Sequence, residues 1–147
     1  MIALIQRVRE AHVLVEGDNI GEIGVGILAF VGVEKTDEIT QAQRLLQRIL
    51  GYRIFADSED KMNLSLTDTG GGLLLVPQFT LAADTRKGMR PSFSTAAEPE
   101  KGRTLFEYMG QIAGEKHAPV AFGRFGADMQ VSLVNDGPVT FWLEAHK

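Results

Sequence analysis

The chain has 147 residues, of which 44% are hydrophobic and 23% are charged, and its formal net charge is −4. This composition is typical of a globular protein that buries roughly 70% of its unfolded surface, and it argues against a disordered, fibrous or membrane protein. No cysteine is present, which excludes disulfides, cysteine-ligated metals and thiolate catalysis and fits a cytoplasmic location. The negative charge disfavours a protein that coats nucleic acid non-specifically, so an RNA partner would need a local basic patch.

The first 33 residues predict the opening strands of a sheet. Residues 2–15 are rich in β-branched and aliphatic side chains, and a turn cluster at residues 17–19 leads into one or two further strands over residues 20–33. Four glycines spaced through this last range indicate bends, so we expect a curved or barrel-like sheet. Charge at Arg7 interrupts the apolar start, which is too short for a signal peptide or a membrane span.

The middle of the sequence predicts a helix and several strands. Apolar residues recur at helical spacing over residues 39–50, and Gly51 follows as a stop. Short strands are predicted at residues 52–55 and 64–66, with a polar hairpin loop between them. Residues 73–81 form an almost uninterrupted apolar run, which predicts a strand buried on both faces.

The last third predicts a second helix and the closing strands. A loop over residues 84–94 precedes a helix with Pro99 in its first turn, and this helix is expected to end before Gly114. Strands are predicted at residues 121–125, 129–135 and 139–144. We therefore expect one α+β domain over residues 1–147, with a mostly antiparallel, curved sheet and two main helices.

The common sequence patterns of metal sites, nucleophile elbows and phosphate loops are absent from this chain. His12, His117 and His146 are scattered and lack the carboxylate pairing of a metal site, so no metal or other cofactor is expected. No Gly-x-Ser-x-Gly elbow is present, and the glycines of residues 21–26 lack the Lys-Ser/Thr ending of a phosphate loop. A Ser-His-Asp triad stays open, because its members need only meet in space.

Two segments depart from their surroundings. At Pro77-Gln78-Phe79-Thr80 the buried apolar run acquires a proline, an amide and a hydroxyl, which fits either an edge strand or a strand that opens its backbone N–H groups to a ligand. Residues 135–140, Asn-Asp-Gly-Pro-Val-Thr, lie between two apolar strands, and the residues alone favour a turn.

Together these segments resemble the D-aminoacyl-tRNA deacylase family of bacteria and eukaryotes, over almost the whole length. The least similar stretch is residues 96–120. The matching motifs are MIALIQRV, VEG, GEIG, RILGYRIF, KMNLS, QFTLAADT, GMRPSFS and GRFGADMQVSLVNDGPVTFWL.

The resemblance implies a deacylase-like fold and a homodimer with active sites at the subunit interface. A cis Gly137-Pro138 pair would reach from one subunit into the site of the other, where main-chain carbonyls hold the α-amino group of the substrate. The same pair would block an L side chain, so selectivity rests on a penalty against the wrong substrate. Arg7 would brace this loop.

The resemblance places the other half of the site at Gln78-Phe79-Thr80, whose backbone N–H groups would form an oxyanion hole worth about 3–4 kcal/mol per donor. The family motif opens with serine where this chain has Pro77, which removes a hydroxyl and one N–H donor. Two mechanisms stay open: attack by Thr80, or water assisted by the 2′-hydroxyl of the RNA. We favour the second, because the sequence offers Thr80 no activating base.

The remaining expectations concern the tRNA. Its terminal adenosine needs an apolar or stacking cleft, for which Phe79, Phe125 and Met129 are the candidates, although core packing explains them equally well. Arg86, Lys87 and Arg90 are candidates for the acceptor-stem phosphates, or are simply solvated.

The alternative function is a non-catalytic nucleic-acid-binding module on the same fold. Such a module is expected to carry an additional basic tail, which residues 142–147 do not form. We expect the chain to cleave D-aminoacyl-tRNA, to spare L-aminoacyl-tRNA, and to cleave glycyl-tRNA mischarged on tRNA(Ala), since glycine has no side chain to exclude.

Overall fold

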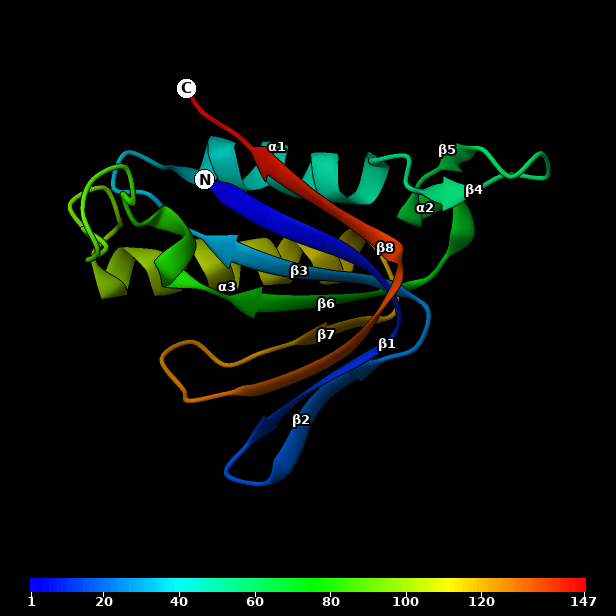
Figure 1. Cartoon of the computed structure of the whole chain (residues 1–147), viewed down its shortest axis with the longest axis horizontal. Coiled ribbons are helices and arrows are strands. Elements are labelled where there is room, and N and C mark those ends of the chain that lie inside the picture. The colour runs from blue at the N-terminus through cyan, green and yellow to red at the C-terminus, as the bar shows by residue number, and fades with distance from the viewer.

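The computed structural model describes residues 1–147 and has a strongly curved, barrel-like sheet with helices against one side (Figure 1). Strand β1 (Ile2–Val15) pairs antiparallel with β2 (Asp18–Ile23), β3 (Gly26–Gly32) and β8 (Gln130–Glu144). Strand β6 (Gly72–Pro77) runs parallel to β3 and to β7 (Val120–Phe122). The α+β class and the curved sheet are confirmed, and antiparallel pairing predominates.

Helix α1 (Ile39–Gly51) begins where its apolar spacing predicts and ends one residue later than predicted, because Gly51 is still helical. The Gln41 side chain accepts a hydrogen bond from the Glu38 backbone N–H at 2.8 Å, which satisfies one of the free donors at the start of the helix. Helix α3 (Pro99–Lys116) continues past Gly114, so the predicted stop is wrong there. Its cap comes later, where the His117 N–H bonds to the Ala113 carbonyl at 2.9 Å.

Between the helices the predicted strands are shorter than expected. Only Phe55–Ala56 (β4) and Met62–Leu64 (β5) pair as a small hairpin, which projects from the body of the molecule (Figure 1). Helix α2 (Leu66–Thr69) follows at once, because Ser65 and Asp68 cap each other's backbone N–H groups. The strand predicted over residues 64–66 therefore ends at its first residue.

Strand β6 is buried on both faces, as predicted, because the sheet has a core on each side. Leu73 and Leu75 pack with β3, α1 and α3 in a cluster of 23 buried residues. Leu74 and Val76 point the other way, into a cluster of 8 buried residues inside the barrel. The predicted strand over residues 73–81 is nevertheless too long, because pairing stops at Pro77 and Phe79–Ala82 forms a 3₁₀-helix, η1.

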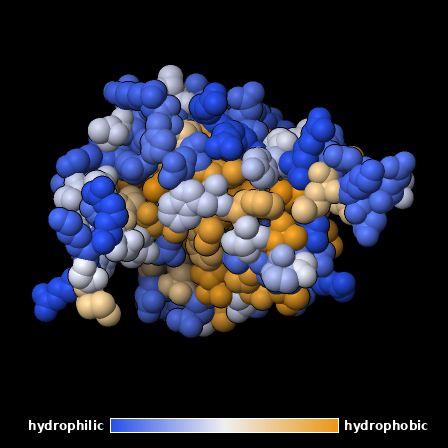
Figure 2. All heavy atoms as spheres, turned by 45° about the horizontal axis from the view of Figure 1, so that its top comes forward, coloured by the Kyte–Doolittle hydropathy of each residue, from blue (hydrophilic) through white to orange (hydrophobic).

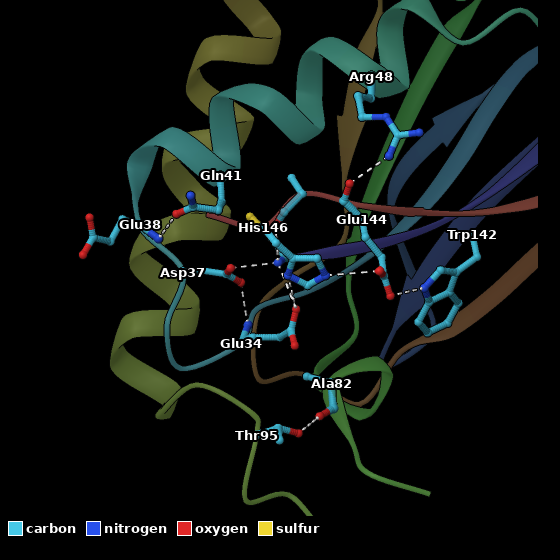
Figure 3. Close-up of polar contacts among 12 residues, drawn as sticks. Glu34, Asp37, Glu38, Gln41, Arg48, Ala82, Thr95, Trp142, Glu144 and His146 are labelled. Atoms are coloured by element: carbon cyan, nitrogen blue, oxygen red, sulfur yellow. Dashed lines mark hydrogen bonds and ion pairs between the residues drawn. The ribbon is translucent and has the colours of Figure 1, made fainter. Parts of the chain in front are cut away.

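The ends of the chain are held by a buried ion cluster beside the last residues of β3 (Figure 3). The α-ammonium of Met1 donates to Asp37 Oδ1 at 2.8 Å, to Glu34 Oε1 at 3.0 Å and to the Ala145 carbonyl at 2.9 Å. Asp37 also accepts from the Glu34 backbone N–H at 2.7 Å. The indole N–H of Trp142, followed by the His146 ring, holds the pKa of the nearby Glu144 carboxyl below its usual value.

None of the helices is both long enough and apolar enough to cross a membrane.

The close approach of β3 to β6 gives a direct test of the fold. A Cβ on Gly26 would lie 1.9 Å from the Gly72 carbonyl oxygen, whereas a Cβ on Gly24 would meet nothing within 4 Å. We expect Gly26→Ala to lower the free energy of unfolding by about 1–3 kcal/mol, the usual cost of overpacking a tight site. Gly24→Ala is the control and should change it little. Urea denaturation measures both, and equal stabilities would contradict the packing described.

Candidate functional site

A cleft opens where β3 and β6 end. Its volume, about 480 Å³, is within the range of small-ligand sites. Its walls come from the ends of these strands, from the start of α3 and from the segment between β7 and β8. Ten of its fifteen lining residues are hydrophobic, and none carries an ionisable side chain. Any chemistry here must therefore use backbone groups, uncharged side chains or groups that the ligand brings.

The 3₁₀-helix η1 presents backbone donors at the edge of this cleft. Phe79 and Thr80 open η1, and the first N–H groups of a helix have no partner within it. The Gln78 N–H, by contrast, already donates to the Val31 carbonyl at 2.8 Å and so extends the parallel ladder by one bond. The free donors of the predicted Gln78-Phe79-Thr80 segment are therefore those of Phe79 and Thr80.

Two contacts fix η1 in place. The Gln78 amide nitrogen donates to the Thr80 hydroxyl oxygen, so this hydroxyl faces an amide, which is not a base. At the other end the Thr95 hydroxyl donates to the Ala82 carbonyl at 2.6 Å (Figure 3). The backbone donors are thus held by side chains on both sides, as preorganised donors must be.

The walls of the cleft contain both predicted residues from the segment after β7. Met129 packs so closely on Gly123 that a Cβ there would lie 2.9 Å from its sulfur and 3.2 Å from the ring of Pro77. Phe125 lies over α3, where a Cβ on Gly102 would be 3.2 Å from its ring. The structure therefore brings Phe125 and Met129 together with Pro77, Gln78 and Phe79.

Phe79 is the most exposed part of the site. Its side chain is 59% exposed although it lines the cleft, and its ring packs against Phe93 with centroids 5.3 Å apart. Phe93 is itself 43% exposed and comes from the loop before α3. An exposed aromatic pair at the mouth of an apolar cleft is suited to stacking against a planar ligand.

The predicted basic residues lie on the exposed loop after η1 and do not line the cleft. Arg86 is already engaged, because its Nε and terminal nitrogen bind the two Asp84 oxygens at 2.9 and 2.7 Å. This pairing lowers the pKa of the Asp84 carboxyl to about 2 and raises the pKa of Arg86. Lys87 and Arg90 form no ion pair within the chain, so they are freer than Arg86 to meet a phosphate.

The segment Asn135 to Thr140 is not a turn between two strands, which corrects the expectation from composition. Strand β8 continues through it, with Asn135 opposite Val8 and Thr140 opposite Gln6, so residues 136–139 bulge out opposite a single residue of β1. The Gly137-Pro138 peptide bond in this bulge is cis, and both residues are exposed.

Arg7 braces the bulge from β1. Its Nε donates to the Asp136 carbonyl at 2.9 Å, and one of its terminal nitrogens donates to the Ile54 carbonyl at 2.7 Å. The Asp136 carboxylate lies 3.8 Å from Nε. Asn135 braces it from within, since its amide oxygen accepts from the Val139 N–H at 2.7 Å and its nitrogen donates to the Thr140 hydroxyl at 2.9 Å.

Gly137 has a conformation that only glycine adopts readily. Its φ is +144°, and a Cβ would lie 2.6 Å from Val139 Cγ2 and 2.8 Å from the Val139 nitrogen. The shape of the bulge is therefore set by Gly137 and by the hydrogen bonds of two bracing side chains, Arg7 and Asn135.

One chain does not bring the bulge and the cleft together. Arg7 stands opposite Ile27, which pairs with Leu73 at the start of β6. Gln78 follows the other end of β6, roughly 16 Å farther along the strand direction. Neither Gly137 nor Pro138 lines the cleft.

The sequence missed several residues that build the site. Asn135 lies in a segment for which the residues alone predict a turn, and no sequence pattern distinguishes Phe93 within its polar loop. Gly102 and Gly123 leave space for the side chains of Phe125 and Met129. No local sequence pattern predicts this role of the two glycines. No group of three or more histidine, aspartate and glutamate side chains is placed to bind a metal ion.

Comparison with known proteins gives a consistent result. Residues 4–144 match the model of a family described as D-Tyr-tRNA(Tyr) deacylase. A D-aminoacyl-tRNA deacylase of Thioalkalivibrio sulfidiphilus is 67% identical over 144 residues, which cover 98% of this chain and 97% of that protein. Its counterpart in Escherichia coli O1:K1 / APEC is 58% identical over 144 residues, which cover 98% and 99%.

Two solved structures share the fold. The c-Myc DNA Unwinding Element Binding Protein superposes with a TM-score of 0.95 at 35% identity, over the whole of both chains. A probable eukaryotic D-amino acid tRNA deacylase superposes with a TM-score of 0.83 over 97% of this chain and 98% of its own. The identity to the second is 16%, so that likeness concerns the fold alone.

Proposed function

This chain belongs to the D-Tyr-tRNA(Tyr) deacylase family, and we propose that it hydrolyses the ester joining a D-amino acid to the 3′-terminal adenosine of tRNA. Its curated relatives are D-aminoacyl-tRNA deacylases, which are hydrolases. The structural observation that carries the proposal is the cleft at the end of β6, with uncharged walls and the free N–H groups of η1 at its edge. We place the protein in the cytoplasm, because aminoacyl-tRNA is made and used in that compartment.

The reaction follows from these donors. Water adds to the ester carbonyl carbon, and the negative charge that develops on the carbonyl oxygen is stabilised by the Phe79 and Thr80 N–H groups. The intermediate collapses by breaking the bond to the 3′-oxygen of the adenosine. The adjacent 2′-hydroxyl of the RNA relays the proton from the attacking water to that oxygen, so the products are a free D-amino acid and tRNA.

Thr80 is not the nucleophile in this mechanism. A threonine hydroxyl needs a neighbouring base to attack a carbonyl. The Thr80 hydroxyl contacts the Gln78 amide instead, and no ionisable side chain lines the cleft. Pro77 likewise has neither a hydroxyl nor an N–H to contribute, so the chemistry is assigned to the donors that follow it.

A complete site requires two copies of the chain in a homodimer. The Gly137-Pro138 bulge lies at the opposite end of β6 from the cleft, so it serves a cleft only if it belongs to another subunit. Strand β8 has a free edge, because it pairs only with β1. Its Val134 and Trp142 side chains are 46% and 49% exposed. Apolar side chains also gather on one face of the molecule, with some polar residues among them (Figure 2).

Chirality is selected by shape. In the proposed dimer, carbonyls of the partner's bulge bind the α-amino group of the substrate, and the bulge occupies the space of an L side chain. Arg7 and Asn135 hold the bulge rigid, so an L side chain cannot push it aside without breaking their hydrogen bonds. Glycine has no side chain to exclude, so glycyl-tRNA mischarged on tRNA(Ala) is also a substrate.

The adenosine enters the apolar cleft between Phe125 and Met129, with the exposed Phe79 ring available for stacking. The loop that carries Arg86, Lys87 and Arg90 meets the acceptor stem. Because Arg86 is paired with Asp84, Lys87 and Arg90 make the greater contribution there.

A second candidate function is binding of nucleic acid without hydrolysis. It is favoured by one observation, the close structural likeness to a protein described as a DNA unwinding element binding protein. The family and the preorganised donors of the cleft favour the deacylase.

The main test compares purified protein on D-tyrosyl-tRNA, L-tyrosyl-tRNA and glycyl-tRNA(Ala), with no added metal. We expect rapid release of D-tyrosine and glycine, and release of L-tyrosine no faster than spontaneous hydrolysis, because only the L side chain meets the bulge. Binding of tRNA without cleavage of any ester would instead support the second candidate function, binding of nucleic acid without hydrolysis.

The oxyanion donors are tested by Phe79→Pro, which removes one N–H at the first position of a helix, where proline is tolerated. We expect kcat to fall about 10²–10³-fold, as for the loss of one oxyanion donor. Phe79→Ala is the matched control, since it removes the ring and keeps the N–H donor. It should raise KM and change kcat little. Thr80→Ala should keep most of its activity, and a 10³-fold loss there would restore the nucleophile mechanism.

The shared site is tested by mixing two inactive chains. Phe79→Pro disables the cleft and Gly137→Val disables the bulge, so each homodimer should be inactive. If chains assort at random into dimers, co-expression should restore about a quarter of the activity, because half of the dimers are mixed and each contains one intact composite site. No recovery would mean that both parts act within one chain, and sedimentation of a monomer would contradict the dimer.

A further inference from the structure

A second groove, of about 580 Å³, lies beside the cleft. It runs between α3 and the segment after β7, and the two hollows share the wall formed by Phe106 and Phe125. The groove therefore adjoins the cleft on the side of Phe125. Unlike the cleft, the groove is charged: Arg103 and Arg124 line it, with Glu107 as its one carboxylate.

Arg103 stands where the two hollows meet. Its guanidinium lies over the Phe125 ring, 5.1 Å from the centroid, and one of its terminal nitrogens would be 3.7 Å from a Cβ on Gly126. Phe125 and Gly126 both line the cleft. The ion pair of Arg103 with Glu107 is long, at 3.9 Å, and both side chains are more than half exposed, so it competes weakly with another anion.

Arg124 is the freer of the two cations. Its side chain is exposed and forms no ion pair within the chain. Its backbone is fixed to the cleft wall, because its N–H donates to the Met129 sulfur at 3.3 Å. On a chain with a net charge of −4, two available guanidiniums in one groove contrast with Arg86, whose charge is neutralised by Asp84.

We propose that this groove binds the phosphodiester backbone of the unpaired nucleotides that precede the terminal adenosine, with Arg103 and Arg124 as the phosphate ligands. The inference rests on the proposed function, which puts the adenosine in the adjoining cleft. Guanidinium groups bind phosphate oxygens with paired hydrogen bonds, and a single-stranded 3′ end has the flexibility to follow the groove. Arg103 also offers a flat surface for stacking.

The experiment compares two substrates of the intact protein. D-Tyrosyl-tRNA carries the upstream nucleotides, whereas D-tyrosyl-adenosine has the same ester and adenosine but no phosphodiester. The test variant is R103Q/R124Q. The control is R44Q, which removes the charge of an exposed arginine of α1 that lines neither hollow and forms no ion pair. Thermal unfolding verifies that the variants fold.

For R103Q/R124Q we expect kcat/KM on D-tyrosyl-tRNA to fall by about tenfold through KM, because lost binding common to ground and transition state raises KM alone. Activity on D-tyrosyl-adenosine should be unchanged. The slope of log(kcat/KM) against log salt for the tRNA should become shallower by about 1.4, at about 0.7 per phosphate of a single strand. R44Q should match the wild type in all three measurements.

Other outcomes overturn the inference in distinguishable ways. Equal losses on both substrates would place the arginines in the cleft, and wild-type behaviour on the tRNA would leave the groove without a role. If the wild-type protein cleaves neither substrate, the proposed function itself fails and the inference fails with it.

Discussion

The structure depends on a single long strand. Strand β1 pairs with β8 along its whole length on one side and with β3 and then β2 on the other, so both cores and the site are built outward from it. Because Arg7 lies in the middle of β1, its contacts with Asp136 and Ile54 fix the bulge of β8 relative to the rest of the sheet. The same strand thus sets the fold and the position of the bulge.

No ionisable side chain lines the cleft, so the placement of main-chain groups carries more weight there. In the proposed mechanism the acting groups are the N–H groups of Phe79 and Thr80 and the carbonyls of Gly137 and Pro138. Proline at position 79 would remove a donor and position 137 requires glycine, but otherwise the placement of these main-chain groups matters more than the side chains they carry. That placement rests on supports: Thr95 on Ala82, Gln78 on Thr80, and Asn135 on Val139. Pro77 lacks an N–H, and the next N–H, that of Gln78, is used by the sheet in a hydrogen bond to the Val31 carbonyl. The first free donors therefore come after both residues.

Sequence patterns predicted the features that depend on local periodicity. Helix α1, the hairpin of β1 and β2 and the doubly buried β6 follow from apolar spacing and turn residues. The patterns failed at α3, which passes through Gly114, and at residues 135–140. These residues stay in a strand, where Arg7 of β1 and the neighbouring Asn135 hold them. The sequence pattern marks residues 77–80 as unusual. It does not predict which of their N–H groups stay free, because that depends on the hydrogen bond from Gln78 to the Val31 carbonyl in another strand.

In the proposed dimer, division of the site between two chains would also account for the proposed selectivity. A bulge on the same chain as the cleft would move with it, whereas a bulge anchored on a partner's β1 is held by a separate rigid sheet. The wall against an L side chain would then be as stiff as the dimer interface, because yielding requires either the loss of the Arg7 hydrogen bonds or the separation of two subunits. Rejection by shape alone, without any charged group in the cleft, would depend on the penalty that such a wall imposes on the wrong substrate.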